Sequence, residues 1–276
     1  GVREIFGDGA AVGRPLAGDD RLRPDFRIAA SDLLTPAQRD RVGKRLTAWL
    51  RARVETELAP LFADPAGLPA GPARGVLYRL REHLGSMPRA AAAAELEALS
   101  RPGRQALRRA GLQIGRESVY APKLLKPAAA ALRGLLYGLD AGAPVAPLPP
   151  GRVSVPAEPG VADDYYEAVG YRRLGRLAVR VDIVERVAAR AWELGQKGGF
   201  EMPAELMNLI GCGADDLAEI LGRLGYRRAV KGDTVTFHRK RPKAGRAGAR
   251  PGRPRRPDPD SPFAKLGGLM DGAGPP

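Results

Sequence analysis

Residues 203–240 encode two short helices and a hairpin in the sequence PAELMNLIGCGADDLAEILGRLGYRRAVKGDTVTFHRK. Pro203 begins the first helix, and a Gly-Cys-Gly turn separates it from a second helix, which starts with an acidic pair and ends before Gly225. Acidic side chains favour the first turn of a helix, and glycine favours the position after its last turn. Beyond that glycine, two β-like segments flank Lys-Gly-Asp, which predicts strands over 226–230 and 234–240.

A longer helix is predicted upstream of this stretch. Apolar side chains recur every three or four residues between Val181 and Leu194, which is the period of one helical face. Three helices followed by a hairpin are the order found in a winged helix-turn-helix. We therefore expect residues 161–241 to form a winged-helix-like domain.

Helical patterns fill the segment between residues 33 and 139. Thr35, Pro36 and Gln38 combine a capping box with a proline in the first turn, which predicts the start of a helix. The apolar stripe of this helix consists of Val42, Leu46, Trp49, Leu50, Val54, Leu58 and Leu61. Further helical patterns cover residues 73–84, 88–99, 102–110 and 127–139. Residues 33–139 are therefore expected to form an all-helical domain.

Three other segments differ in composition from these domains. Short apolar stretches broken by Gly and Asp predict a small β element over residues 1–32. The proline-rich residues 140–160 are expected to form an extended linker. Residues 242–276 are expected to be a disordered basic tail. The predicted fold class is therefore mainly α (α+β), with a helical bundle before the linker and a winged-helix-like domain after it.

The chain is strongly basic. It contains 45 Lys and Arg residues against 31 Asp and Glu residues, which gives a formal net charge of +14. Residues 239–256 contain no acidic residue and these basic ones: Arg239, Lys240, Arg241, Lys243, Arg246, Arg250, Arg253, Arg255 and Arg256. The preceding residues also carry a basic excess, which is typical of a protein that binds a polyanion. Codon bias explains the preference for Arg over Lys, but it does not explain the shortage of acidic residues.

The sequence contains no motif for catalysis. Cys212 is the single cysteine, and His83 and His238 are the two histidines, which excludes an intrachain disulfide and a Cys/His zinc cluster. The sequence lacks a phosphate loop with Lys followed by Ser or Thr, so this chain is not expected to hydrolyse ATP or to hold a cofactor. No apolar run approaches the ~20 residues of a membrane span, so we expect a cytoplasmic protein without a membrane partner.

The hairpin near residue 230 is the main candidate for contact with phosphates. The hairpin and the residues after it carry these basic side chains: Arg227, Arg228, Lys231, His238, Arg239, Lys240 and Arg241. The helix before it presents Asp215, Asp216 and Glu219 against one arginine, which is unfavourable for contact with bases. We therefore expect binding mainly through phosphates and without sequence selectivity. The alternative is a scaffold role, in which this domain packs against a neighbouring domain.

The tetrapeptide GYRR occurs twice, at residues 170–173 and 225–228. Each copy follows a helix that begins with an Asp pair, and each leads into a β-like stretch. A duplicated helix–strand element is one interpretation, and a chance similarity is the other. The first copy adds Arg172 and Arg173 to the candidate residues for binding nucleic acid.

A rigid loop is predicted between residues 116 and 127, which contain two prolines. In one interpretation, Tyr120 stacks on a base while Lys123 and Lys126 contact phosphates. In the other interpretation, Tyr120 and the two leucines between the lysines pack in the core, and the lysines are solvated.

Several stretches of the sequence resemble one family of proteins. The resemblance rests on these stretches: ALRRAGLQIGRESVY at residues 106–120, LLKP at 124–127, AVGYR at 168–172, VRVD at 179–182, ELMNLIGC at 205–212, LGYR at 224–227 and DSPFAKL at 260–266. Together they resemble the C-terminal accessory region of alphaproteobacterial superfamily 2 helicases, which are related to the mitochondrial RNA-degradosome helicase. Glu117 departs from the pattern, because such proteins usually carry an aromatic residue there.

The resemblance implies an accessory region that grips or guides RNA or DNA for an ATP-dependent helicase. The motor domains, with their ATP and magnesium, would lie upstream in the same polypeptide and are absent from this sequence. Two other functions are compatible with the residues. One is a stand-alone winged-helix DNA-binding regulator, which the acidic third helix disfavours. The other is an interaction scaffold, in which the segment from Ser261 to Met270 docks on a protein partner.

Overall fold

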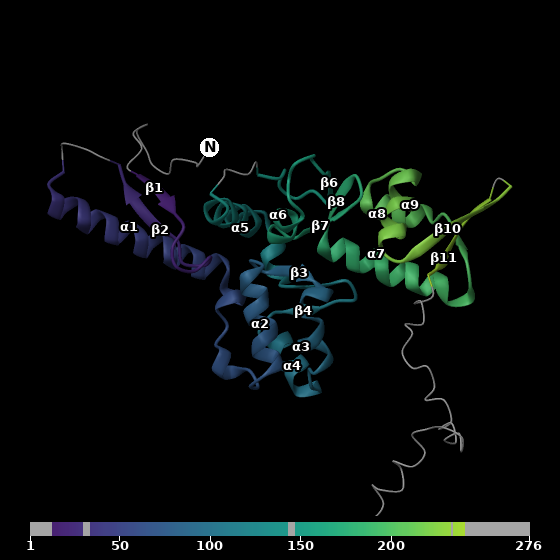
Figure 1. Cartoon of the computed structure of the whole chain (residues 1–276), viewed down its shortest axis with the longest axis horizontal. Coiled ribbons are helices and arrows are strands. Elements are labelled where there is room, and N and C mark those ends of the chain that lie inside the picture. Colours follow the sequence, from purple (N-terminus) through teal and green to yellow (C-terminus); the bar gives the residue numbers. More distant parts are fainter. Residues whose placement is uncertain (1–12, 30–33, 143–146, 233, 241–276) are drawn as a thin grey trace, which may run out of the picture. The chain divides into compact units, whose positions relative to one another are not determined.

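The computed structural model of the chain describes residues 13–29, 34–142, 147–232 and 234–240 (Figure 1). Helices alternate with four small antiparallel sheets along these residues, which confirms the expected α+β class. The residues up to Arg239 contact one another closely enough to form one compact unit. The predicted tail over residues 242–276 and the first part of the predicted β element lie outside the described residues.

The N-terminal hairpin packs against the first helix. β1 (Gly13–Leu16) pairs antiparallel with β2 (Asp25–Ile28), and β2 lies along α1 (Pro36–Glu57). The predicted capping box is present, because the Thr35 hydroxyl accepts a hydrogen bond of 3.3 Å from the backbone three residues later. The predicted apolar stripe is buried only toward its C-terminal end, and Trp49 is 48% exposed.

The domain predicted to be all-helical contains a sheet. After two 3-10 turns, η2 (Ala59–Phe62) and η3 (Pro65–Gly67), the elements are α2 (Pro72–Glu82), β3 (Ser86–Pro88), η4 (Arg89–Ala92), α3 (Ala93–Glu97), α4 (Arg101–Arg109), β4 (Gln113–Ile114) and β5 (Ser118–Tyr120). The strands pair antiparallel in the order β3-β5-β4, so the prediction of helices alone is wrong here. Each strand has two or three residues, which is too short to show a strand pattern in the sequence.

The next part of the chain builds a second sheet of the same form. It follows the 3-10 turn η5 (Pro122–Leu125) and contains α5 (Pro127–Asp140), β6 (Ser154–Pro156), α6 (Asp163–Ala168), β7 (Tyr171–Leu174) and β8 (Leu177–Arg180). The strand order is β6-β8-β7. β6 lies within the segment predicted to be a linker, so the end of that segment is a sheet strand and not a free connector.

The last part matches the predicted helices and hairpin closely. It contains α7 (Val181–Leu194), η6 (Gly195–Lys197), β9 (Phe200–Glu201), α8 (Ala204–Ile210), α9 (Ala214–Arg223), β10 (Tyr226–Lys231) and β11 (Thr234–Arg239). The two-residue strand β9 pairs with β11, which gives the strand order β10-β11-β9.

The three parts share one topology, and we call them the first repeat (residues 72–120), the second repeat (127–180) and the third repeat (181–239). In each repeat a helix leads to a short strand, one or two further helices follow, and a hairpin ends the repeat. In each sheet the short first strand pairs with the last strand of the hairpin. The two GYRR copies in the sequence therefore belong to a topology that occurs three times in the structure.

A glycine with positive φ precedes the hairpin of each of the three repeats. The φ angles are 83° at Gly111, 90° at Gly170 and 90° at Gly225. Glycine adopts this left-handed conformation without the steric cost that other residues meet, so it can end a helix and start a strand within one residue. The residue that follows is buried in all three cases, and these residues are Leu112, Tyr171 and Tyr226.

The repeats do not have separate cores. Leu136 and Ala168 of the second repeat belong to the cluster built mainly by the first repeat. Leu174 and Val179, also of the second repeat, belong to the cluster of the third repeat. The predicted boundary at residues 140–160 therefore does not divide the hydrophobic core, because the second repeat packs on both of its neighbours.

Candidate nucleic-acid interface

The β10–β11 hairpin carries basic side chains on both faces. Successive side chains of a strand point to opposite sides, so Arg227 and Lys231 share one face of the hairpin. Arg228 and Arg239 lie on the other face, which also includes the buried Phe237 near the base. These four basic side chains are exposed, and none of them forms an ion pair with another described residue. Figure 1 shows the hairpin extending beyond the helices of its own repeat.

The other predicted residues at the end of the hairpin differ in accessibility. His238 is half-buried beside Gly199, and its Nε2 lies 3.2 Å from the hydroxyl of Thr236. Its ring therefore already has a polar partner. Lys240 is exposed, whereas Arg241 lies outside the described residues.

Arg172 and Arg173 are half-buried, and each forms an ion pair with a carboxylate of the same chain. Arg172 donates a hydrogen bond of 2.8 Å to the Glu117 side chain, and Arg173 lies 3.6 Å from Asp163. Arg173 also donates to the backbone carbonyl of Val161 at 3.4 Å. These carboxylates offset part of the positive charge that would attract a phosphate, so the two arginines are weaker candidates for binding nucleic acid than the residues of the β10–β11 hairpin.

Tyr120 is a core residue. Only 3% of its surface is exposed, and burial raises the pKa of its hydroxyl to about 12. Its ring cannot stack on a base, so that prediction is wrong. The alternative of a core-packing loop is confirmed for Tyr120 and Leu124, whereas Leu125 is half-buried. Lys123 and Lys126, which flank Leu124 and Leu125 in the sequence, are exposed and remain candidates for contact with phosphates.

The turn of the first hairpin is occupied by a carboxylate from the third repeat. The backbone N–H groups of Arg116, Glu117 and Ser118 donate to the two oxygens of Glu185 on α7, at 2.5, 2.9 and 2.6 Å. Successive backbone N–H groups form a site for an anion in such turns. Burial raises the pKa of Glu185, and the three hydrogen bonds oppose that effect. Glu185 therefore joins the first repeat to the third.

The turn of the second hairpin meets another carboxylate of the third repeat. The Arg176 N–H donates to Glu219 on α9 at 3.3 Å, and its guanidinium donates to Asp216 on the same helix at 2.8 Å. The acidic face that the sequence places on α9 is therefore used for contact with the second repeat. This contact explains why the helix carries acidic residues at a position where a DNA-reading helix would carry basic ones.

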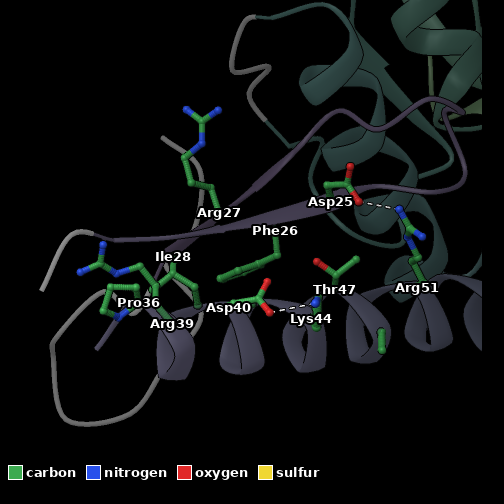
Figure 2. Close-up of a pocket in the computed structure, with 12 residues that line it drawn as sticks. Asp25, Phe26, Arg27, Ile28, Pro36, Arg39, Asp40, Lys44, Thr47 and Arg51 are labelled. Carbon is green, nitrogen blue, oxygen red and sulfur yellow. Dashed lines mark hydrogen bonds and ion pairs between the residues drawn. The ribbon is translucent and has the colours of Figure 1, made fainter. Parts of the chain in front are cut away.

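A mixed-charge groove lies between β2 and α1 (Figure 2). It has a volume of about 870 Å³, and the aromatic ring of Phe26 lines it. Two ion pairs border it: Asp25 with Arg51 at 2.5 Å, and Asp40 with Lys44 at 2.8 Å. These two pairs neutralise one another, so the basic excess of the groove comes from Arg27 and Arg39 alone. The groove is therefore a weaker candidate for phosphates than the β10–β11 hairpin.

A buried polar cluster joins the first and second repeats. The Arg133 side chain is fully buried and donates to Ser86 Oγ at 2.6 Å and to the carbonyl oxygens of Leu124 and Glu167 at 3.0 and 3.4 Å. Burial lowers the pKa of Arg133 to about 9, so it remains charged at neutral pH. Burial also raises the pKa of the Glu167 carboxyl to about 7.

Burial also lowers the pKa of His83, which lies 3.9 Å from the Glu167 carboxyl. The imidazole is therefore neutral at pH 7, and the contact is not an ion pair there. The contacts of this cluster are internal, so it supports the packing of the repeats and not contact with an external ligand.

The α4 helix is basic, and its arginines are not among the residues that the sequence predicts to bind nucleic acid. Four of its nine residues are exposed arginines: Arg101, Arg104, Arg108 and Arg109. The signal in the sequence is the run RPGRQALRR, which has no acidic residue. The run alone does not show that α4 is equivalent to the helices before the other two hairpins. That equivalence follows from the short strands around α4, which place it at the same position within a repeat.

No group of three or more His, Cys, Asp or Glu side chains in the described part of the chain is arranged to hold a metal ion. Burial raises the pKa of the Cys212 thiol to about 11, so the thiol is protonated at neutral pH. Among the same residues, no helix has the length and apolar character needed to cross a membrane.

Comparison of the chain with protein-family models, with curated proteins and with solved structures finds no match.

Proposed function

We propose that this chain is an accessory nucleic-acid-binding region of an ATP-dependent helicase and holds the strand through phosphate contacts. The motor domains would lie elsewhere in the polypeptide and would supply ATP hydrolysis. The main support is the β10–β11 hairpin, which exposes Arg227, Arg228, Lys231 and Arg239 without a carboxylate partner among the described residues. Each phosphate that such a side chain contacts releases counterions, which supplies affinity without sequence selectivity.

The topology of the third repeat supports the same function. Its order of helix, short strand, two helices and hairpin, with the short strand paired to the last one, fits the winged helix that we expect from the sequence. In this repeat the second of the two central helices, α9, contacts the second repeat through Asp216 and Glu219. The hairpin is therefore the part of the module that remains available. This arrangement disfavours the stand-alone regulator, which would use α9 to read bases.

Binding to single strands tests this function. Fluorescence anisotropy would be measured with single-stranded RNA and DNA of equal length and unrelated sequences, over a range of salt concentrations. We expect similar affinity for all sequences, with log K falling linearly with log salt at a slope of about 0.7 for each phosphate contact. Substituting the four hairpin residues by Gln is expected to reduce the slope and the affinity for every strand. Binding to one duplex sequence alone, or no binding to any strand, would contradict the proposal.

A further inference from the structure

The helix that precedes the hairpin differs in charge among the three repeats. In the second and third repeats these helices, α6 and α9, each carry two Asp residues in the first turn. In the first repeat the equivalent helix, α4, has four arginines and no acidic residue. Because this helix enters the groove of DNA in winged-helix proteins, its charge shows which repeat is suited to that contact.

The arginines of α4 lie on the side away from the core. Ser100 caps the helix by accepting a hydrogen bond from the Gly103 N–H at 3.3 Å. Gly103 and Leu107 are the buried residues of the helix, and they lie four positions apart on one face. The other residues of the helix, apart from the half-buried Ala106, are exposed: Arg101, Pro102, Arg104, Gln105, Arg108 and Arg109.

None of the four α4 arginines forms an ion pair with a residue that the structure describes. Arg104 donates to the carbonyl of Leu96 at 2.8 Å, which fixes its side chain near the helix start. Many other arginines of the chain, such as Arg172 and Arg190, already bind carboxylates. The positive charge of α4 is thus available to an external anion.

The equivalent helices of the other repeats are occupied by contacts inside the protein. On α9, Asp216 and Glu219 bind the turn of the second hairpin. On α6, Tyr165 and Tyr166 are buried, and Tyr165 packs edge-on against Tyr137 of α5. Among the described residues, only the first repeat combines the winged-helix topology with a helix at this position whose charged residues are all exposed arginines.

We propose that the first repeat binds double-stranded DNA, with α4 lying in the major groove and its arginines contacting the phosphates. The proposal rests on the proposed function and names the duplex as the substrate of this surface. The major groove of B-form DNA admits an α-helix, whereas the deep and narrow major groove of duplex RNA does not. An α-helix with its side chains is about 10–12 Å across, which matches the width of that groove, about 12 Å. The hairpin of the third repeat holds the separated strand.

A charge-matched pair of variants tests this assignment on the full chain. The test variant is Arg101→Gln/Arg108→Gln/Arg109→Gln, which retains the hydrogen bond of Arg104 to the backbone. The control is Arg152→Gln/Arg186→Gln/Arg223→Gln, which removes the same charge at three exposed positions on other elements. Anisotropy would be measured with duplex DNA, duplex RNA and single-stranded DNA of one length, and circular dichroism would confirm that each variant is folded.

We expect the test variant to bind duplex DNA at least about 30-fold more weakly, because removing each arginine that touches the duplex costs several-fold in affinity. The salt slope should fall by about 0.9 for each phosphate that is no longer neutralised, and affinity for single strands should fall by less than about threefold. The control should change duplex binding by less than about threefold. The single variant Arg108→Gln gives a smaller reduction of the same kind and serves if the triple variant does not fold.

Two outcomes would overturn the assignment of duplex DNA to α4. One is duplex DNA binding by the test variant that equals that of the control, and the other is an equal reduction for duplex RNA. Both leave the proposed function standing if the unaltered chain binds single strands in a salt-dependent way. Failure of the unaltered chain to bind any of the three nucleic acids would instead refute the proposed function itself.

Discussion

Replacing Glu185 by Ala should destabilise the contact between the first and third repeats. The carboxylate accepts three hydrogen bonds of 2.5 to 2.9 Å from the backbone of the turn between β4 and β5. No other side chain of the described residues is placed to accept these hydrogen bonds when Glu185 is removed. Hydrogen bonds to a charged group contribute about 1.5–3 kcal/mol each, but the cost of burying the carboxylate offsets part of that gain. We therefore expect the free energy of unfolding to fall by about 2–4 kcal/mol.

The neighbouring Gly115 gives an independent test of the same contact. A Cβ atom at this position would lie 2.2 Å from Cδ of Glu185, so Gly115→Ala must displace the carboxylate. Once Glu185 is Ala, that clash is gone. The double variant should therefore lose less stability than the sum of the two single variants, with a coupling of at least about 1 kcal/mol.

Urea unfolding measures the global effect, and hydrogen exchange at residues 116–118 measures the local one. The three backbone N–H groups should lose protection in Glu185→Ala, because their acceptor is removed. Glu193→Ala is the control on the same helix, since Glu193 is exposed and pairs only with Arg190 in the described structure. An unchanged unfolding midpoint together with unchanged exchange at residues 116–118 would refute this reasoning.

Three further predictions concern the buried cluster and the glycines. Arg133→Met should lower the free energy of unfolding by about 1–3 kcal/mol in urea titration, because the Leu124 carbonyl oxygen loses its Arg133 donor and Ser86 Oγ keeps only the hydrogen bond that it donates to the Glu167 carbonyl; an unchanged free energy would show that the core tolerates the loss of these two contacts. Burial raises the pKa of Glu167 from 4.5 to about 7, so the stability from its neutral form is complete below pH 4.5 and is lost as pH rises through 7. The melting temperature of wild type relative to Glu167→Gln should therefore fall over that range, and a constant difference would contradict the shift. Gly170→Ala should cost clearly more than the ~1 kcal/mol of Gly225→Ala in the same titration. Both glycines have φ near 90°, but a Cβ at Gly170 would meet Leu125 at 2.6 Å, whereas the space at Gly225 is open; equal losses would count against the clash.

The local features of the third repeat were predictable because their signals lie in adjacent residues. The apolar period over Val181–Leu194 matches α7, and Gly225 separates α9 from β10 as expected. The capping box at Thr35 is equally local, and it is present. Each of these features depends on residues within one helical turn or one hairpin. Because those residues are neighbours in the sequence, the feature can be recognised without the fold.

The short strands could not be predicted in this way. β3 and β5 pair across about thirty intervening residues, and β4, β6 and β9 have only two or three residues. A strand of that length has no period to detect, so its existence depends on a partner that is distant in the sequence. For this reason the topology shared by the repeats, and with it the position of α4, emerged only from the folded chain.

The sequence alone established that the chain is basic, lacks a catalytic motif and carries cationic residues around the last hairpin. It could not distinguish which cations are available. Arg172 and Arg173 meet carboxylates in the fold, whereas Arg227 and Arg228 meet none among the described residues. The difference arises because the charge near an arginine depends on residues that folding brings within a few ångströms, and Glu117 is more than fifty positions from the Arg172 that it binds.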